Sequence, residues 1–62
     1  MRDPRVDPKA GDISRNSDGK EFKVVKRDGD TVCYLTDGEY EEMEIEDWRK
    51  WAANDEVLHA AD

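Results

Sequence analysis

Two Asp-Gly pairs, at residues 28–29 and 37–38, divide the middle of this chain into three short segments rich in β-branched and aromatic residues. An Asp-Gly pair readily adopts the positive φ angles that a tight two-residue hairpin requires. The spacing therefore predicts three consecutive antiparallel strands, over residues 20–27, 31–36 and 39–45. Two tight turns at this spacing restrict the chain to folds that contain a β-meander, in which consecutive antiparallel strands are joined by hairpins.

The first segment has the alternation of a strand with one buried face. Phe22 and Val24 lie on one side, and charged residues such as Lys23 lie on the other. Val25 follows Val24 directly and interrupts the alternation. It indicates either a bulge or a second covered side.

The next two segments have different patterns. Residues 31–36 (TVCYLT) carry apolar side chains on both faces, which predicts a central strand covered on both sides. In residues 39–45, the odd spacing of Tyr40 and Met43 predicts a bulge at Glu41 or Glu42.

Shorter elements are expected on either side of the meander. Residues 11–15 are a candidate strand with Ile13 facing inward, and the turn-forming residues 16–19 follow it. After the meander the period changes to that of a helix of one or two turns, which Asp47 can cap. Trp48, Trp51 and Ala52 share one helical face, and residues 55–59 form a last short strand.

The two ends of the chain lack a periodic pattern. Residues 1–10 contain Pro4 and Pro8, which favour an extended arm, pinned by Val6. Residues 60–62 are expected to fray.

Composition limits the stability and the class of the protein. With 62 residues, of which 35% are hydrophobic and 44% charged, the chain has room for one small domain of marginal stability. Cys33 is the only cysteine, so no internal disulfide strengthens this domain. The sequence contains no secretory segment and no long apolar run, so we expect a cytoplasmic protein that does not bind membranes.

The segments PKAGDI, VCYLTDG and DWRKWA, at residues 8–13, 32–38 and 47–52, resemble those of small SH3-like barrel proteins of phage and prophage origin. The resemblance implies an all-β domain over residues 11–59, with four to five antiparallel strands and one short helix near the C-terminus. The Ala-Leu-Tyr-Asp-Tyr segment of signalling SH3 domains is absent, so their peptide-binding surface is not implied. Since most of these phage proteins have no assigned activity, the resemblance implies a fold rather than a function.

Charge is segregated along the chain, which has a net charge of −7. Residues 1–27 contain eight Lys or Arg and five Asp or Glu, whereas residues 28–48 contain nine Asp or Glu and no Lys or Arg. The acidic residues 39–47 form either a solvated strand face that prevents edge-to-edge association or a surface for a basic partner. The favoured hypothesis is a binding module that engages a host or phage protein with a basic surface. Its candidate residues are Glu39, Tyr40, Glu41, Glu42, Glu44 and Glu46.

Two other functions remain open. A nucleic-acid-binding module would use the cations of residues 20–27 with a nearby aromatic ring, although the acidic half of the chain repels phosphate. Its candidate residues are Lys20, Lys23, Lys26, Arg27 and Tyr34. Alternatively, these cations pair with the acidic strands within the molecule. The third function is a structural homo-oligomer, and the sequence does not fix the oligomeric state.

The aromatic residues carry two further alternatives. Trp48 and Trp51 are expected to close the barrel, but if one of them remains exposed it is a candidate anchor for a partner. Tyr34 and Tyr40 could together form a cage for a methylated cation.

The sequence indicates that the protein is not an enzyme and uses no cofactor. Cys33 lies in an apolar run, where a thiol is usually a buried hydrophobe, and neither Ser14 nor Ser17 has an evident base beside it. His59 lies near the chain end, and one Cys with one His gives no metal-ligand pattern.

Overall fold

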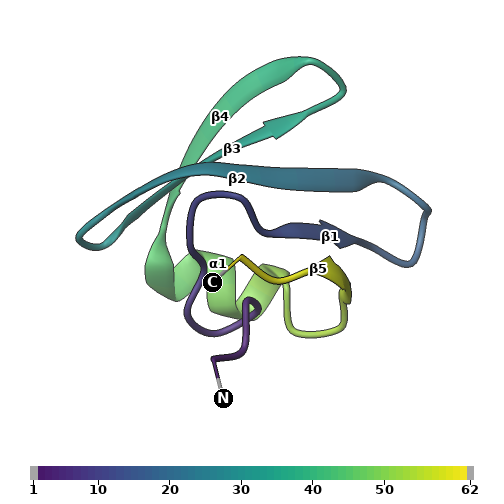
Figure 1. The fold of residues 1–62 in the computed structure, drawn as a ribbon, viewed down its shortest axis with the longest axis horizontal. Helices are drawn as coiled ribbons and strands as arrows, with labels where there is room; N and C mark the ends of the chain where they lie inside the picture. Colours follow the sequence, from purple (N-terminus) through teal and green to yellow (C-terminus); the bar gives the residue numbers. More distant parts are fainter. Residues whose placement is uncertain (1, 62) are drawn as a thin grey trace.

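The computed structural model describes residues 2–61, which form one open antiparallel sheet of five strands and one short helix (Figure 1). The elements are β1 (Ile13–Arg15), β2 (Glu21–Asp28), β3 (Thr31–Thr36), β4 (Glu39–Glu44), α1 (Ile45–Trp51) and β5 (Glu56–His59). The strand order is β4-β3-β2-β1-β5, so β4 and β5 are the sheet edges. The mostly-β class is confirmed, and the short helix precedes the last strand, as the residues predicted, so it is not at the C-terminus itself.

The two Asp-Gly pairs form different turns. Between β3 and β4, Asp37 and Gly38 both have positive φ angles, of 52° and 77°, as in a type I′ turn. Between β2 and β3, the loop residues are Gly29 and Asp30, one position later than predicted. Gly29 has a φ of 59° at the first loop position, which fits a type II′ turn. The predicted three-stranded meander is confirmed.

One of the two predicted bulges is present. The β2–β3 register shifts between Val24 and Lys26, so Val25 is the bulged residue. The β3–β4 register is regular throughout, and the bulge predicted at Glu41 or Glu42 is wrong. That prediction assumed that the apolar residues of β4 share one side, whereas they lie on opposite sides of the sheet.

The helix also starts earlier than predicted. Glu44 is the residue before the helix and makes no side-chain cap, while Asp47 lies in the first turn instead of capping it. The first helical N–H, that of Ile45, donates to the carbonyl oxygen of Asp30 at 2.7 Å. The β2–β3 loop therefore supplies the acceptor that lets β4 run directly into α1.

The core lies between α1 and one side of the sheet. Its buried residues are Phe22, Val24, Val32, Tyr34, Ile45, Trp48 and Ala52, with Met43 packed against them. On the other side of β3, Cys33 is buried but Leu35 is 37% exposed, so the prediction that this strand is covered on both sides holds only at Cys33. In β1 the buried residue is Ser14, and the prediction that Ile13 faces inward is wrong because Ser14 is the residue that pairs with Phe22.

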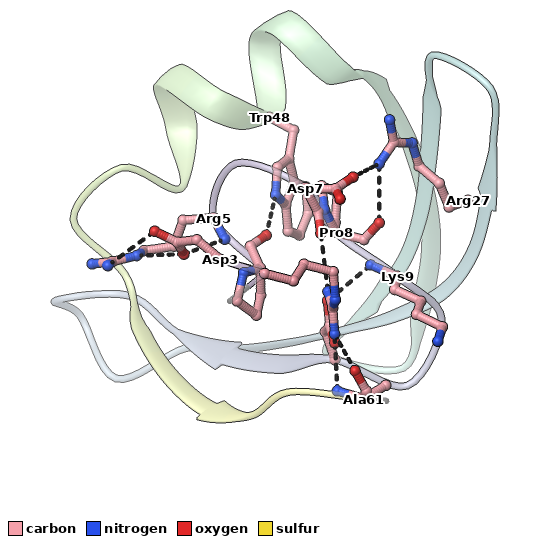
Figure 2. A network of polar contacts seen from close by, with 11 residues as sticks. Asp3, Arg5, Asp7, Pro8, Lys9, Arg27, Trp48 and Ala61 are labelled. Atoms are coloured by element: carbon pink, nitrogen blue, oxygen red, sulfur yellow. Dashed lines mark hydrogen bonds and ion pairs between the residues drawn. The ribbon is translucent and has the colours of Figure 1, made fainter.

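The N-terminal segment is folded onto the core instead of forming an extended arm. A turn closes on the carbonyl oxygen of Asp3, and both prolines are buried. Trp48 Nε1–H donates to the carbonyl oxygen of Pro4 at 3.1 Å (Figure 2). Val6, which was expected to pin the arm, is 50% exposed. The backbone of this segment therefore supplies contacts that hold it to the core. The pattern of side chains in the sequence does not predict such contacts.

A buried carboxylate, that of Asp12, joins the two ends of the chain (Figure 2). It accepts two hydrogen bonds from the Arg2 guanidinium, at 2.6 and 2.8 Å. It also accepts the backbone N–H groups of Lys9 at 2.8 Å and Ala61 at 2.7 Å. Because Asp12 is only 2% exposed, all four bonds form away from bulk water.

These bonds determine the ionisation of Asp12 and the order of the C-terminus. Burial alone would raise the pKa of Asp12, but its hydrogen bonds, above all those from Arg2, leave the pKa below its ordinary value. The tail predicted to fray over residues 60–62 is held at Ala61, while Asp62 lies outside the described residues.

Asp55, between α1 and β5, is a second buried carboxylate, and its surroundings shift its pKa in the direction opposite to that of Asp12. It is 6% exposed, and its Oδ2 atom has no hydrogen-bond partner among the described residues. Burial raises the pKa of Asp55, although the Arg5 charge opposes the shift. The charged form of Asp55 therefore lowers the stability of the fold as pH rises through this raised pKa.

We expect Asp55→Asn to raise the free energy of unfolding at pH 7 by about 1 kcal/mol, because the amide has no charge to desolvate. The gain should shrink as pH falls through the folded-state pKa, where the wild-type carboxyl is protonated. Urea unfolding at several pH values measures this, with the exposed Asp18→Asn as a control that should change little. A variant less stable than wild type at pH 7 would contradict the assignment.

Candidate functional site

The pleat of β4 divides its acidic residues between the two sides of the sheet. The register places Glu41 opposite the core residue Tyr34, and Tyr40 opposite Leu35 on the other side. We call these the helix side and the outer side. Because successive strand residues alternate, the helix side carries Glu39 and Glu41, and the outer side carries Tyr40, Glu42 and Glu44. The sixth candidate residue, Glu46, lies in α1.

The β4 carboxylates are not neutralised within the molecule. None of them forms an ion pair with another residue in the described range 2–61. The hypothesis that the β2 cations pair with them is not supported, because the uncharged strand β3 lies between β2 and β4. Two of the candidate cations of residues 20–27 pair outside the strands: Lys20 with Asp37 in the β3–β4 turn at 3.1 Å, and Arg27 with Asp7 at 2.9 Å.

On the helix side, Tyr34 of β3 pairs with Glu41 of β4 and contacts an exposed tryptophan, Trp51. The Trp51 ring is 40% exposed, whereas Trp48 is 1% exposed. Ring centroids lie 4.4 Å from Trp51 for Phe22, and 5.4 Å for both Tyr34 and Trp48, so three rings hold Trp51 in place. Burial raises the pKa of Tyr34, and the charge of Glu41 adds to the shift, so Glu41 lies next to this cluster.

We call Glu39, Glu41 and Trp51 the acidic–aromatic surface. Both tryptophans were expected to close the barrel; Trp48 is buried in the core of an open sheet, whereas Trp51 is 40% exposed, as in the alternative of an exposed anchor. Sequence reasoning did not link Trp51 to the helix-side carboxylates. The i, i+3 spacing of the tryptophans indicated that they share a helical face. It did not indicate which part of the sheet that face packs against.

Tyr40 lies on the outer side beside Cys33 and Glu42. The Cys33 thiol donates to Glu42 Oε2 at 3.4 Å. A hydrogen bond with Cys33 raises the pKa of Tyr40 to about 12, and burial and the nearby charge of Glu42 act in the same direction. Because Tyr34 faces α1, Tyr34 and Tyr40 lie on opposite sides of the sheet and do not form a joint cage.

The five candidate nucleic-acid-binding residues are also dispersed. Tyr34 is buried, Lys20 is paired with Asp37, and Arg27 donates to Asp7, Pro8 and Gly29. Only Lys23 and Lys26 are exposed, unpaired cations of this set among the described residues, and both lie on the outer side. Two cations do not form a track along a phosphate backbone.

A polar depression of about 320 Å³ lies where the β2–β3 loop meets the start of α1. Its lining residues are Arg27, Asp30, Glu44, Ile45, Glu46 and Arg49. Arg27 Nε–H donates to Gly29 O at 2.7 Å and Arg49 Nε–H donates to Val6 O at 2.8 Å, so both arginines fasten neighbouring backbone. Sequence reasoning missed this depression, because two segments that are distant in the sequence, residues 27–30 and 44–49, assemble it. Within residues 2–61, no three His, Cys, Asp or Glu residues are grouped to hold a metal ion.

Comparison with protein-family models, with curated proteins and with solved structures found no match. The helix of residues 2–61 lacks the length and apolar content required to cross a membrane. The acidic–aromatic surface and the outer side of the sheet are the two surfaces from which we infer function below.

Proposed function

We propose that this protein is a small non-enzymatic binding module and that its acidic–aromatic surface binds a basic segment of a partner protein. Trp51 carries the proposal, because it is an exposed ring held by three others, and the carboxylates of Glu39 and Glu41 lie on the same side of the sheet without an ion pair among the described residues. Tryptophan is among the residues most frequent at binding hot spots, and its face attracts Lys and Arg side chains. Glu39 and Glu41 add charge complementarity to this contact.

The remaining acidic candidates have a more distant role in this proposal. Tyr40, Glu42 and Glu44 lie on the outer side, and Glu46 lies in α1. Together with the net charge of −7, the carboxylates of Glu42, Glu44 and Glu46 would steer a basic host or phage protein toward the molecule without contacting the bound segment.

The proposal includes the finer fold and origin: a small SH3-like barrel protein of phage or prophage descent that acts in the cytoplasm. Its support is the succession of short antiparallel strands with one helix before the last strand. The single free thiol, that of Cys33, suits a reducing compartment.

A tryptophan-free peptide of alternating lysine and arginine provides the probe. With protein below about 1 μM, we expect saturable changes in tryptophan emission, since Trp51 is the exposed indole. Replacing Glu39 and Glu41 together by lysine, or Trp51 by leucine, should weaken binding at least about tenfold, which corresponds to 1.4 kcal/mol.

The matched control replaces Glu42 and Glu44 by lysine, which changes the net charge equally but on the outer side. It should weaken binding about threefold or less, because only steering is affected. Equal weakening by the two charge reversals would contradict a site on the helix side, provided that circular dichroism shows both variants folded.

A further inference from the structure

The outer side of β2, β3 and β4 is largely exposed, although Cys33 in the middle of it is buried. In Figure 1, β1 and β5 continue the sheet below β2, and α1 and the N-terminal segment also lie below the three strands. Two large apolar side chains lie on the outer side, Leu35 at 37% and Tyr40 at 56% exposure. Exposed apolar residues adjoining one another on a sheet face indicate an interaction surface.

Charge on this face changes sign across the three strands. One row of paired residues runs from Lys23 through Leu35 to Tyr40. The next runs from Lys26 through Cys33 to Glu42. From β2 to β4, both of these rows therefore pass from a cation through an apolar residue to an aromatic ring or an anion.

This order is complementary to itself, and we propose that a second copy of this chain packs against the outer side about a two-fold axis parallel to β3. Such an axis places β2 of one copy over β4 of the other, and β3 over β3. Lys26 then faces Glu42 of the second copy, and Lys23 faces the ring of Tyr40. Leu35 meets its own counterpart near the axis.

The charges also favour this orientation over others, and they limit the stability of the dimer. An axis perpendicular to the strands would place the lysines of β2 over each other, which is unfavourable. In the third row, Asp28 and Glu44 flank Thr31, so the proposed axis brings acids together there and confines the contact to the first two rows. With a net charge of −7 on each copy, the dimer is a weak one that screening salt favours.

The dimer is independent of the proposed function, because it leaves the acidic–aromatic surface of each copy free. Glu39, Glu41 and Trp51 lie on the helix side, away from the second copy. Two such surfaces in one dimer would raise the affinity for a partner with two basic segments.

Sedimentation velocity over a range of concentrations at about 0.15 M salt tests the dimer. We expect wild type to shift from monomer to dimer, and Lys26→Glu, Glu42→Lys and Leu35→Lys each to weaken dimerisation at least about tenfold. Mixing Lys26→Glu with Glu42→Lys should restore a dimer that contains one copy of each. Only contact between chains can do this, since a pair within one chain is not repaired by mixing.

Two results would overturn the proposal. One is a wild type that remains monomeric up to about millimolar concentration, the weak end of specific association. The other is a wild-type dimer that these substitutions do not weaken, which would place the contact elsewhere, such as at the β4 or β5 edges. Circular dichroism of each variant tests whether it is folded, which separates loss of the dimer from loss of the fold. A mixed dimer that forms from two variants shows independently that both are folded.

Discussion

Asp12→Ala is expected to remove at least about a third of the free energy of unfolding at neutral pH. Removing one partner of a buried ion pair typically costs about 3–5 kcal/mol, and this carboxylate also holds the backbone N–H groups of Lys9 and Ala61. Arg2 is 22% exposed, which places the cost at about 3 kcal/mol. A domain of this size has a total stability of only about 3–9 kcal/mol. Urea unfolding followed by tryptophan emission measures the loss.

The matched control is Asp3→Ala, since Asp3 also pairs with an arginine of the N-terminal segment. The Asp3–Arg5 pair is about two-fifths exposed on both sides, so its loss should cost clearly less stability than the loss of the Asp12 pair. Equal costs for the two substitutions would contradict the role given to Asp12.

The contribution of Asp12 to the free energy of unfolding should also depend on pH and should decrease as the pH falls. Because its folded-state pKa lies below the ordinary value of 3.8, its stabilisation is complete above that value and is lost as pH falls through the lower folded-state pKa. The difference in stability between wild type and Asp12→Asn should therefore narrow on acidification. A difference that grows at low pH would contradict this assignment.

Trp48→Ala is the substitution with the second large effect. Trp48 is 1% exposed and joins the sheet, α1 and the N-terminal segment, so its truncation should cost about 3–5 kcal/mol. Trp48→Phe retains a ring but leaves the Pro4 carbonyl without its donor, and should cost about 1–3 kcal/mol. Thermal unfolding followed by circular dichroism measures both.

Trp51→Ala provides the comparison within the same helix. Since Trp51 is 40% exposed, its truncation should cost clearly less than that of Trp48. If Trp51→Ala were the more destabilising variant, Trp51 would be the core residue and its role as a binding anchor would be lost.

The sequence predicted local structure well, because local chemistry determines it here. Positive φ angles at Gly29, Asp37 and Gly38 explain why the Asp-Gly pairs form hairpins. The break in alternation at Val25 coincides with the observed bulge. The change of period near Trp48 gave the helix, although its start depended on the acceptor that Asp30 supplies from another loop.

The parts that the sequence did not predict depend on distant contacts. Asp12 bonds to Ala61, 49 positions away, and Trp48 bonds to Pro4, 44 positions away. No periodic pattern records such pairs, so the N-terminal segment was interpreted as an extended arm.

The candidate site was partly predictable for a related reason. The row of acidic residues is evident in the sequence. Which of these residues lie on each side of the sheet depends on the β3–β4 register, because a shift of one residue moves every side chain to the other side. The bulge wrongly expected at Glu41 or Glu42 hid this division. The adjacency of Trp51 to Glu41 depends on how α1 lies over the sheet rim, which the sequence leaves open.

A titration of isotope-labelled protein with the lysine–arginine peptide, followed by amide and indole chemical shifts, tests the binding proposal most directly. We expect the largest shifts at the Trp51 indole and at the backbone of Glu39 to Glu41, and small shifts at Lys23 and Lys26. Shifts spread evenly over all acidic residues, or an unmoved Trp51 indole at saturation, would contradict a binding site at the acidic–aromatic surface.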